Sequence, residues 1–285
     1  MTSSTHEFNR YDDVRAALAD PLLVPLPAAP GAESGVAWLR AAVARFSTGA
    51  EHARRRALVQ AELDRLDPAA LRSAAAAGPE GEARLLVVRA LAEGLGLPEP
   101  DAVAEAVALV ARTYFGGEDA EADAAVAWLL PRMFPHHAGA DQEAAANRIG
   151  LLVQACDATG GLVEHARRAA ADCAAPLPLP ALLAETLRHD PPVRVIRRVA
   201  AGDTKLAEVP IAEGDLVVLD VAAANRDPLH FADPAVFRIE RTGPPALTFA
   251  GPPRLCPGRD HALALAAGVL ERDQLPSTRT EPRTP

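Results

Sequence analysis

One cysteine of this sequence stands in a setting suited to binding a metal. Cys256 ends the stiff run Phe249-Ala250-Gly251-Pro252-Pro253-Arg254-Leu255, and Pro257-Gly258 and a helix-forming segment follow it. A helix N-terminus offers free backbone N–H groups, which stabilise a thiolate and lower its pKa. A thiolate ligand pushes electron density onto heme iron and favours cleavage of an O–O bond. We therefore interpret Cys256 as a candidate ligand of heme iron, with an unliganded surface cysteine as the alternative.

The residues beside Cys256 fit the same interpretation. Gly258 lacks a Cβ and lets the backbone approach a flat ring closely, while Arg254 can pair with a carboxylate on that ring. Cys156 and Cys173 are widely spaced, and no Cys-X-X-Cys pair occurs. Neither a disulfide framework nor a structural zinc site is therefore expected, and both cysteines are interpreted as small buried hydrophobic residues.

The elements that must position this loop are mostly helices. Apolar spacing and strong helix formers predict helices over residues 12–18, 51–63, 85–95, 101–115, 120–130, 147–170, 181–189 and 259–270. Gly160-Gly161 is a point where the long helix can open or kink. Short strands are predicted over 193–199, 205–211 and 215–221, and loops over 21–35 and 227–257. The predicted fold class is mainly α with small β-sheets.

Composition limits the classes of function. Hydrophobic residues make up 49% and charged residues 24% of the 285 residues, which is typical of a globular protein. The net charge of −9 argues against a nucleic-acid partner, because phosphate binding needs a concentrated basic face. No run approaches the ~18 apolar residues of a membrane span, and no secretory signal is expected. These features indicate a cytoplasmic protein without a membrane partner.

The cysteine loop resembles the heme-binding signature of the cytochrome P450 family. That signature has a phenylalanine, a basic residue two positions before the cysteine and a glycine two positions after it. Here these positions are Phe249, Arg254, Cys256 and Gly258. Two of the family's glycines are replaced, by Ala250 after the phenylalanine and by Pro252 four residues before the cysteine.

A second motif supports the resemblance. Glu185-Thr186-Leu187-Arg188 resembles the family's ExxR helix, in which a spacing of three places both side chains on one face. The same spacing occurs at Glu51/Arg54, Glu62/Arg65 and Glu164/Arg167. Glu185 is singled out because the family's proline turn and arginine strand follow it, at Pro191-Pro192 and up to Arg198. The resemblance implies that Arg241 joins Glu185 and Arg188 as a third partner.

The resemblance also implies a set of heme contacts. His52 to Arg56 is similar to the family's HxxxR helix, whose histidine and arginine meet the heme propionates, and a solvated basic helix face is the alternative. Arg198 stands at the family's strand position for another propionate contact. Together with Phe249, Arg254 and Gly258, these residues would hold heme b, and Cys256 would ligate its iron.

Leu151 to Thr159 resembles the family's distal helix, which crosses the heme face. Asp157 keeps the acid of the family's proton relay, Ala158 stands where its threonine belongs, and Thr159 follows one residue later. Ala155 is the small residue beside the oxygen site. The resemblance thus implies that Asp157 and Thr159 are catalytic and that proton delivery is weakened or rerouted. Polar residues exposed on a long helix are the alternative.

The expected architecture is a shortened cytochrome P450 fold. Residues 1–272 would form a single heme domain with abbreviated lid regions, and residues 273–285 a disordered polar tail. The expected function is a heme-thiolate oxidoreductase, a monooxygenase that oxidises a small, largely apolar metabolite with electrons from a ferredoxin-type partner. Peroxygenase or non-oxidative chemistry, and a degenerate non-catalytic homologue that acts as an interaction partner, remain alternatives.

Two smaller features have more ordinary explanations. The adjacent His136-His137 is interpreted as an exposed pair rather than a metal site. Arg54, Arg55 and Arg259 can form a docking patch for an acidic electron-transfer protein, although solvated arginines are the default.

Overall fold

The computed structural model describes residues 3–134, 141–171 and 177–274 of the chain. The helices are α1 (Tyr11–Ala19), α2 (Gly35–Ala42), α3 (Gly49–Leu63), α4 (Pro68–Ala76), α5 (Ala83–Gly94), α6 (Pro100–Ala111), α7 (Ala120–Leu129), α8 (Gln142–Ala170), α9 (Leu179–His189), α10 (Val221–Ala224) and α11 (Arg259–Gln274), with short 3-10 turns η1 (Ala44–Phe46), η2 (Leu130–Arg132) and η3 (Leu247–Phe249). The strands are β1 (Thr5–Phe8), β2 (Leu23–Val24), β3 (Val195–Ala200), β4 (Thr204–Leu206), β5 (Val209–Ile211) and β6 (Leu216–Asp220).

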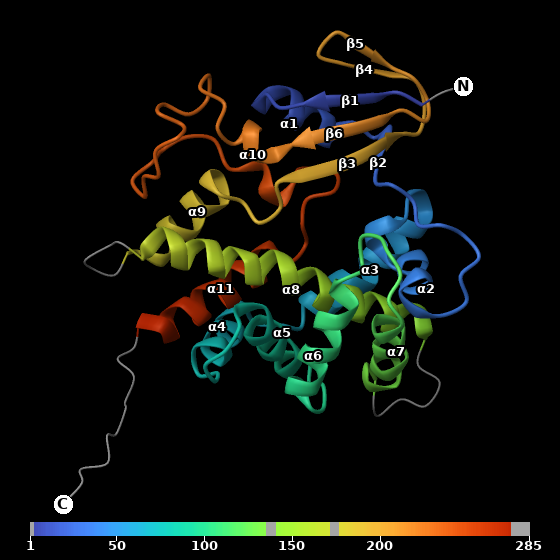
Figure 1. Cartoon of the computed structure of the whole chain (residues 1–285), viewed down its shortest axis with the longest axis vertical. Coiled ribbons are helices and arrows are strands. Elements are labelled where there is room, and N and C mark those ends of the chain that lie inside the picture. The colour runs from blue at the N-terminus through green and yellow to red at the C-terminus, as the bar shows by residue number, and fades with distance from the viewer. Residues whose placement is uncertain (1–2, 135–140, 172–176, 275–285) are drawn as a thin grey trace, which may run out of the picture.

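The long helix α8 organises the helical half of the molecule. It lies between the sheet on one side and α4, α5 and α6 on the other, and α11 runs close behind it (Figure 1). Gly160 of α8 explains how close α5 comes, since a Cβ there would lie only 2.7 Å from the Cα of Arg84. The pair Gly160-Gly161, a point where a helix can open or kink, does not open here, because α8 is one uninterrupted helix. The absence of a side chain at Gly160 allows α5 to pack closely against α8.

The sheet at the other end carries a buried arginine. Its strand order is β1-β6-β3-β2, with β1 parallel to β6 and the other pairs antiparallel. Alternate residues of β3 point into the core, and Arg198 shares that buried face with Ile196 and Ala200. The sheet therefore directs a guanidinium toward the interior.

The fold class is confirmed as mainly α with small sheets, and several boundaries need correction. The predicted helix over 101–115 ends at Ala111, and the predicted strand over 205–211 is the two-stranded hairpin of β4 and β5. Helices α2 and α4 and strand β1 were not predicted. Helix α11 runs to Gln274, so residues 273 and 274 of the predicted tail belong to a helix, and residues 275–285 lie outside the described residues. None of the helices described is both long and apolar enough to cross a bilayer.

Candidate heme-binding site

The Cys256 loop connects η3 to α11 and is held by its own backbone. The N–H of Cys256 donates to the carbonyl of Phe249 at 3.0 Å, and the N–H of Arg254 donates to that of Gly251 at 2.9 Å. Burial raises the pKa of the Cys256 thiol, although the backbone N–H of Gly258 and the charge of Arg56 both act to lower it. The predicted lowering of this pKa is therefore wrong for the unliganded thiol. A coordinated cation would overcome the effect of burial and hold the sulfur as a thiolate.

Ala250 has a backbone conformation that favours glycine. Its φ is +59° and its ψ is −154°, a combination that side chains rarely adopt. Its position is the one where the related signature has glycine. The loop therefore keeps a glycine-type backbone without a glycine.

Two basic residues tie this loop to the segment around α3. A terminal nitrogen of Arg56 donates to the carbonyl of Leu255 at 2.7 Å, and one of Arg254 donates to the carbonyl of Ser47 at 3.0 Å. His52 lies one turn before Arg56 on the same helix. The structure thus brings residues about 200 positions apart in the sequence to one side of the cysteine loop.

The cations at this loop have no acidic partner. Within the described residues, Arg45, Arg56, Arg198 and Arg254 form no ion pair, whereas nearby Arg54 and Arg55 both bind Glu143. The four unpaired arginines are called the arginine cluster below.

The electrostatics of the arginine cluster show mutual repulsion. Burial, then the charges of Arg45 and Arg254, lower the pKa of Arg198 to about 10. The pKa of Arg254 is lowered by burial and by Arg45 and Arg56. Burial and the charges of Arg254 and Arg56 lower the pKa of His52 to about 4, so its imidazole is neutral at pH 7. Positive charge gathered without acids next to a thiol is the donor set that the two propionates and the iron of heme require, so these residues fit heme.

Sequence reasoning missed Arg45. It lies in η1, outside any motif, and only its electrostatic influence on Arg198 and Arg254 reveals that it belongs to the cluster. The available signal was its place seven residues before His52, which is too weak to assign a role.

The predicted Glu185 triad is confirmed. Arg188 donates to both carboxylate oxygens of Glu185, at 2.8 and 2.7 Å, and Arg241 donates to the same carboxylate at 3.2 Å. Burial would raise the pKa of Glu185, but the bonds from Arg188, the N–H of Arg238 and Arg241 outweigh it and lower that pKa. Glu185 and Arg188 are 4% and 3% exposed. The triad ties α9 to the long segment that leads to the cysteine loop.

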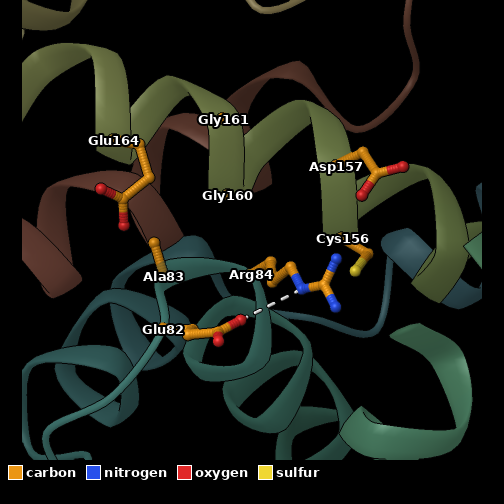
Figure 2. Close-up of a pocket in the computed structure, with 8 residues that line it drawn as sticks. All are labelled: Glu82, Ala83, Arg84, Cys156, Asp157, Gly160, Gly161 and Glu164. Carbon is orange, nitrogen blue, oxygen red and sulfur yellow. Dashed lines mark ion pairs between the residues drawn. The ribbon is translucent and has the colours of Figure 1, made fainter. Parts of the chain in front are cut away.

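The predicted catalytic residues of α8 have different environments. Thr159 is buried and Ala155 partly buried, whereas Asp157 is exposed. Asp157 borders a groove of about 360 Å³ between α8 and the start of α5, where Arg84 faces it from the opposite wall (Figure 2). Asp157 thus meets solvent in this groove, while Thr159 points into the protein.

The remaining sequence predictions have mixed outcomes. Cys156 is buried, as predicted, and burial and the charge of Asp157 raise the pKa of its thiol to about 12. Because Arg54 and Arg55 bind Glu143, two members of the proposed docking patch are already paired. Cys173 and His136-His137 lie outside the described residues.

Comparisons with known proteins agree on one family. The family model described as cytochrome P450 matches residues 162–264. Cytochrome P450 140 of Mycobacterium tuberculosis is 44% identical over 92 residues, which are 32% of this chain and 20% of the relative. The biotin biosynthesis cytochrome P450 of Bacillus subtilis is 40% identical over 74 residues, 26% of this chain and 19% of the relative. The matched segment thus spans about a fifth of the length of these relatives.

The likeness of the fold extends further than that of the sequence. The structure of P450BioI in complex with a hexadecenoic acid-ligated acyl carrier protein aligns with a TM-score of 0.78 at 19% identity, covering 93% of this chain and 84% of that one. A thermophilic cytochrome P450 from Sulfolobus tokodaii aligns with a TM-score of 0.73 at 20% identity, over 95% and 87% of the two chains. The family match over residues 162–264, the bacterial relatives and the shared fold agree, so this chain has the cytochrome P450 fold and a C-terminal segment similar in sequence to that family.

Proposed function

We propose that this chain is a heme-thiolate monooxygenase. The observation that carries the proposal is the arginine cluster, four guanidinium groups without an acid, beside the Cys256 thiol. Cys256 would ligate the iron, His52, Arg56, Arg198 and Arg254 would hold the propionates, and Phe249, Gly258 and Ala155 would contact the ring. Residues 1–272 would act as one heme domain with abbreviated lid regions.

Bound heme b would supply the activation of oxygen, and side chains of α8 would donate protons and exchange them with solvent. Asp157, exposed in its groove, would exchange protons with solvent, and the buried Thr159 would hold water or substrate in place of the threonine that Ala158 replaces. We further propose a small, largely apolar substrate, a ferredoxin-type electron donor and a cytoplasmic location. A relative that is 36% identical over 92 residues is a beta-dihydromenaquinone-9 omega-hydroxylase, which supports oxygenase chemistry.

The carbon monoxide difference spectrum of the reduced, heme-supplied protein tests the proposal. A strongly red-shifted Soret band is expected for the wild type, because only thiolate-ligated iron produces it. Cys256→Ala should lose that band, while Cys156→Ala, a buried cysteine elsewhere, should keep it. Absence of heme after expression with ample heme would overturn the proposal and favour the non-catalytic homologue.

The environment of α8 favours a second candidate, peroxide-driven oxidation. Ala158 stands in place of the relay threonine, and Asp157 faces an open groove, so the proton relay of α8 would be weakened. Peroxide already carries the electrons and protons that the monooxygenase route must import. Turnover with peroxide alone would support this candidate, and strict dependence on a reduced ferredoxin would contradict it.

A further inference from the structure

Arg45 lies against an aromatic wall formed by Phe46 and Phe115. Its guanidinium carbon lies 5.5 Å from the ring centre of Phe46 and 5.8 Å from that of Phe115. Phe46 also packs on Tyr114, with ring centres 5.3 Å apart. These rings stack on the guanidinium but cannot neutralise its charge.

Tyr114 supplies an unpartnered donor at the same place. Its side chain is fully buried, and its hydroxyl has no hydrogen-bond partner among the described residues. A Cβ at Gly150 of α8 would lie 3.2 Å from that hydroxyl, so the hydroxyl lies against α8. A buried hydroxyl without a partner costs free energy, which an acceptor would recover.

The positive charge of the site exceeds what heme can neutralise. The arginine cluster carries four charges, and heme brings two propionates. Two positive charges would therefore remain after heme binds, since His52 is neutral at pH 7. Arg45 and Tyr114 both pack against the ring of Phe46, so Arg45 lies close to this unpartnered donor.

We propose that Arg45 and Tyr114 bind the carboxylate of an apolar monocarboxylate substrate. This inference rests on the proposed function and specifies its substrate class. The carboxylate would accept hydrogen bonds from the Arg45 guanidinium and the Tyr114 hydroxyl, and the apolar body would lie against Phe46 and Phe115.

The fold sets the length of such a substrate. Gly150, which contacts Tyr114, lies five residues before Ala155 and eight before Ala158 on α8. At 1.5 Å of rise per residue, this separation is about 8–12 Å along the helix. A substrate whose carboxylate is held at Arg45 would therefore reach Ala155 and Ala158 with a carbon about that far from the carboxylate.

Calorimetric titration of the heme-loaded protein tests the inference. The probes are decanoate and 4-phenylbutanoate, each paired with the corresponding uncharged alcohol. Each acid should bind at least about tenfold more tightly than its alcohol, because a charge-assisted hydrogen bond is lost with the carboxylate. Arg45→Gln should abolish that preference and Tyr114→Phe should reduce it about threefold. Arg40→Gln, at an arginine of α2 that forms no ion pair within the part of the chain that the structure describes, should leave it intact.

Heme titration of the same variants separates this inference from the proposed function. Arg254→Gln should weaken heme binding at least about tenfold, and Arg45→Gln should weaken it much less, because Arg45 contributes charge to the cluster but would hold no propionate. If Arg45→Gln weakened heme binding as much as Arg254→Gln and left the preference for acids unchanged, Arg45 would be a propionate ligand and the inference would be wrong. It would also be overturned if neither acid bound better than its alcohol.

A chain that took up no heme would contradict the proposed function, and titration of that heme-free protein would still decide the inference. Binding of either acid that depends on Arg45 would support the carboxylate site, and its absence would overturn it.

Discussion

At the scale of single residues, the candidate site shows how burial and charge oppose each other. Burial makes the Cys256 thiol harder to ionise, and it makes the Arg198 guanidinium and the His52 imidazole harder to keep charged. Heme would relieve both effects, because its iron stabilises a thiolate and its propionates stabilise cations. The heme-free site is therefore electrostatically strained.

Because of His52, the stability of the heme-free protein should depend on pH. Its pKa is about 4 in the folded chain, against about 6.5 in an unfolded one. Below pH 6.5 the unfolded chain binds a proton that the folded chain does not, so stability is full above pH 6.5 and falls as the pH drops toward 4. The free energy of unfolding of the heme-free protein, measured with urea, should be lower at pH 5 than at pH 7. His52→Gln should lose less stability between these values, and an equal loss would contradict the assigned pKa.

Ala250 leads to a prediction of the opposite kind, a stabilising substitution. Ala250→Gly should raise the free energy of unfolding by about 1 kcal/mol, because glycine adopts the present φ and ψ without steric cost. Ala246 lies four residues earlier with an ordinary φ of −62°. Ala246→Gly should therefore destabilise the protein by about 0.5–1 kcal/mol. Urea unfolding of both variants checks the difference in sign, and two losses would refute the strain at Ala250.

The residues found from the sequence lie in motifs with fixed spacing, and the residues missed do not. Cys256, Arg254 and Glu185 lie in motifs with fixed spacing, so their environment could be predicted. Arg45 and Tyr114 belong to no motif, and they lie near each other because Phe46 of η1 packs on Tyr114, just after α6. The role proposed for them follows from charge and burial, which a sequence does not record.

At the scale of secondary-structure elements, long periodic segments were predicted and short non-local ones were not. Helix α8 was predicted over 147–170 and spans Gln142–Ala170 because its helix formers are uninterrupted. Strand β1 has only four residues, and its partner β6 lies more than 200 residues away. A strand of that length is stabilised by its partner rather than by its own sequence, so periodicity could not reveal it.

The pair Gly160-Gly161 allows a test of helix packing. Gly160→Ala would place a Cβ 2.7 Å from the backbone of Arg84 on α5, whereas Gly161→Ala would meet Pro192, at 3.0 Å from its Cβ and 4.0 Å from its Cα. We expect Gly160→Ala to destabilise the protein by about 1–3 kcal/mol through overpacking. Gly161→Ala should cost less, because the helix propensity of alanine offsets part of its contact. Urea unfolding measures both, and equal effects would argue against the close approach of α5.

At the scale of the whole molecule, charge is distributed unevenly. The chain has a net charge of −9, yet the arginine cluster gathers four positive charges at the cysteine loop. Most other arginines of the described residues are paired with acids, as Arg54 and Arg55 are with Glu143. The protein thus keeps one region of uncompensated positive charge within an acidic molecule, as a binding site for anionic groups requires.

That distribution predicts how salt acts on the two forms of the protein. Raising sodium chloride from about 0.05 to about 0.5 M should stabilise the heme-free protein, by about 1 kcal/mol, because ions screen repulsion within the arginine cluster. The gain should be smaller with heme bound, since its propionates already neutralise two of the charges.

Arg198→Gln should likewise reduce the gain in the heme-free form, whereas Arg40→Gln, outside the cluster, should not. Urea unfolding at the two salt concentrations measures all four cases. If salt stabilised the heme-free and heme-loaded proteins equally, the cluster would not be the source of the strain, and the assignment of Arg56, Arg198 and Arg254 as propionate ligands would lose its main support.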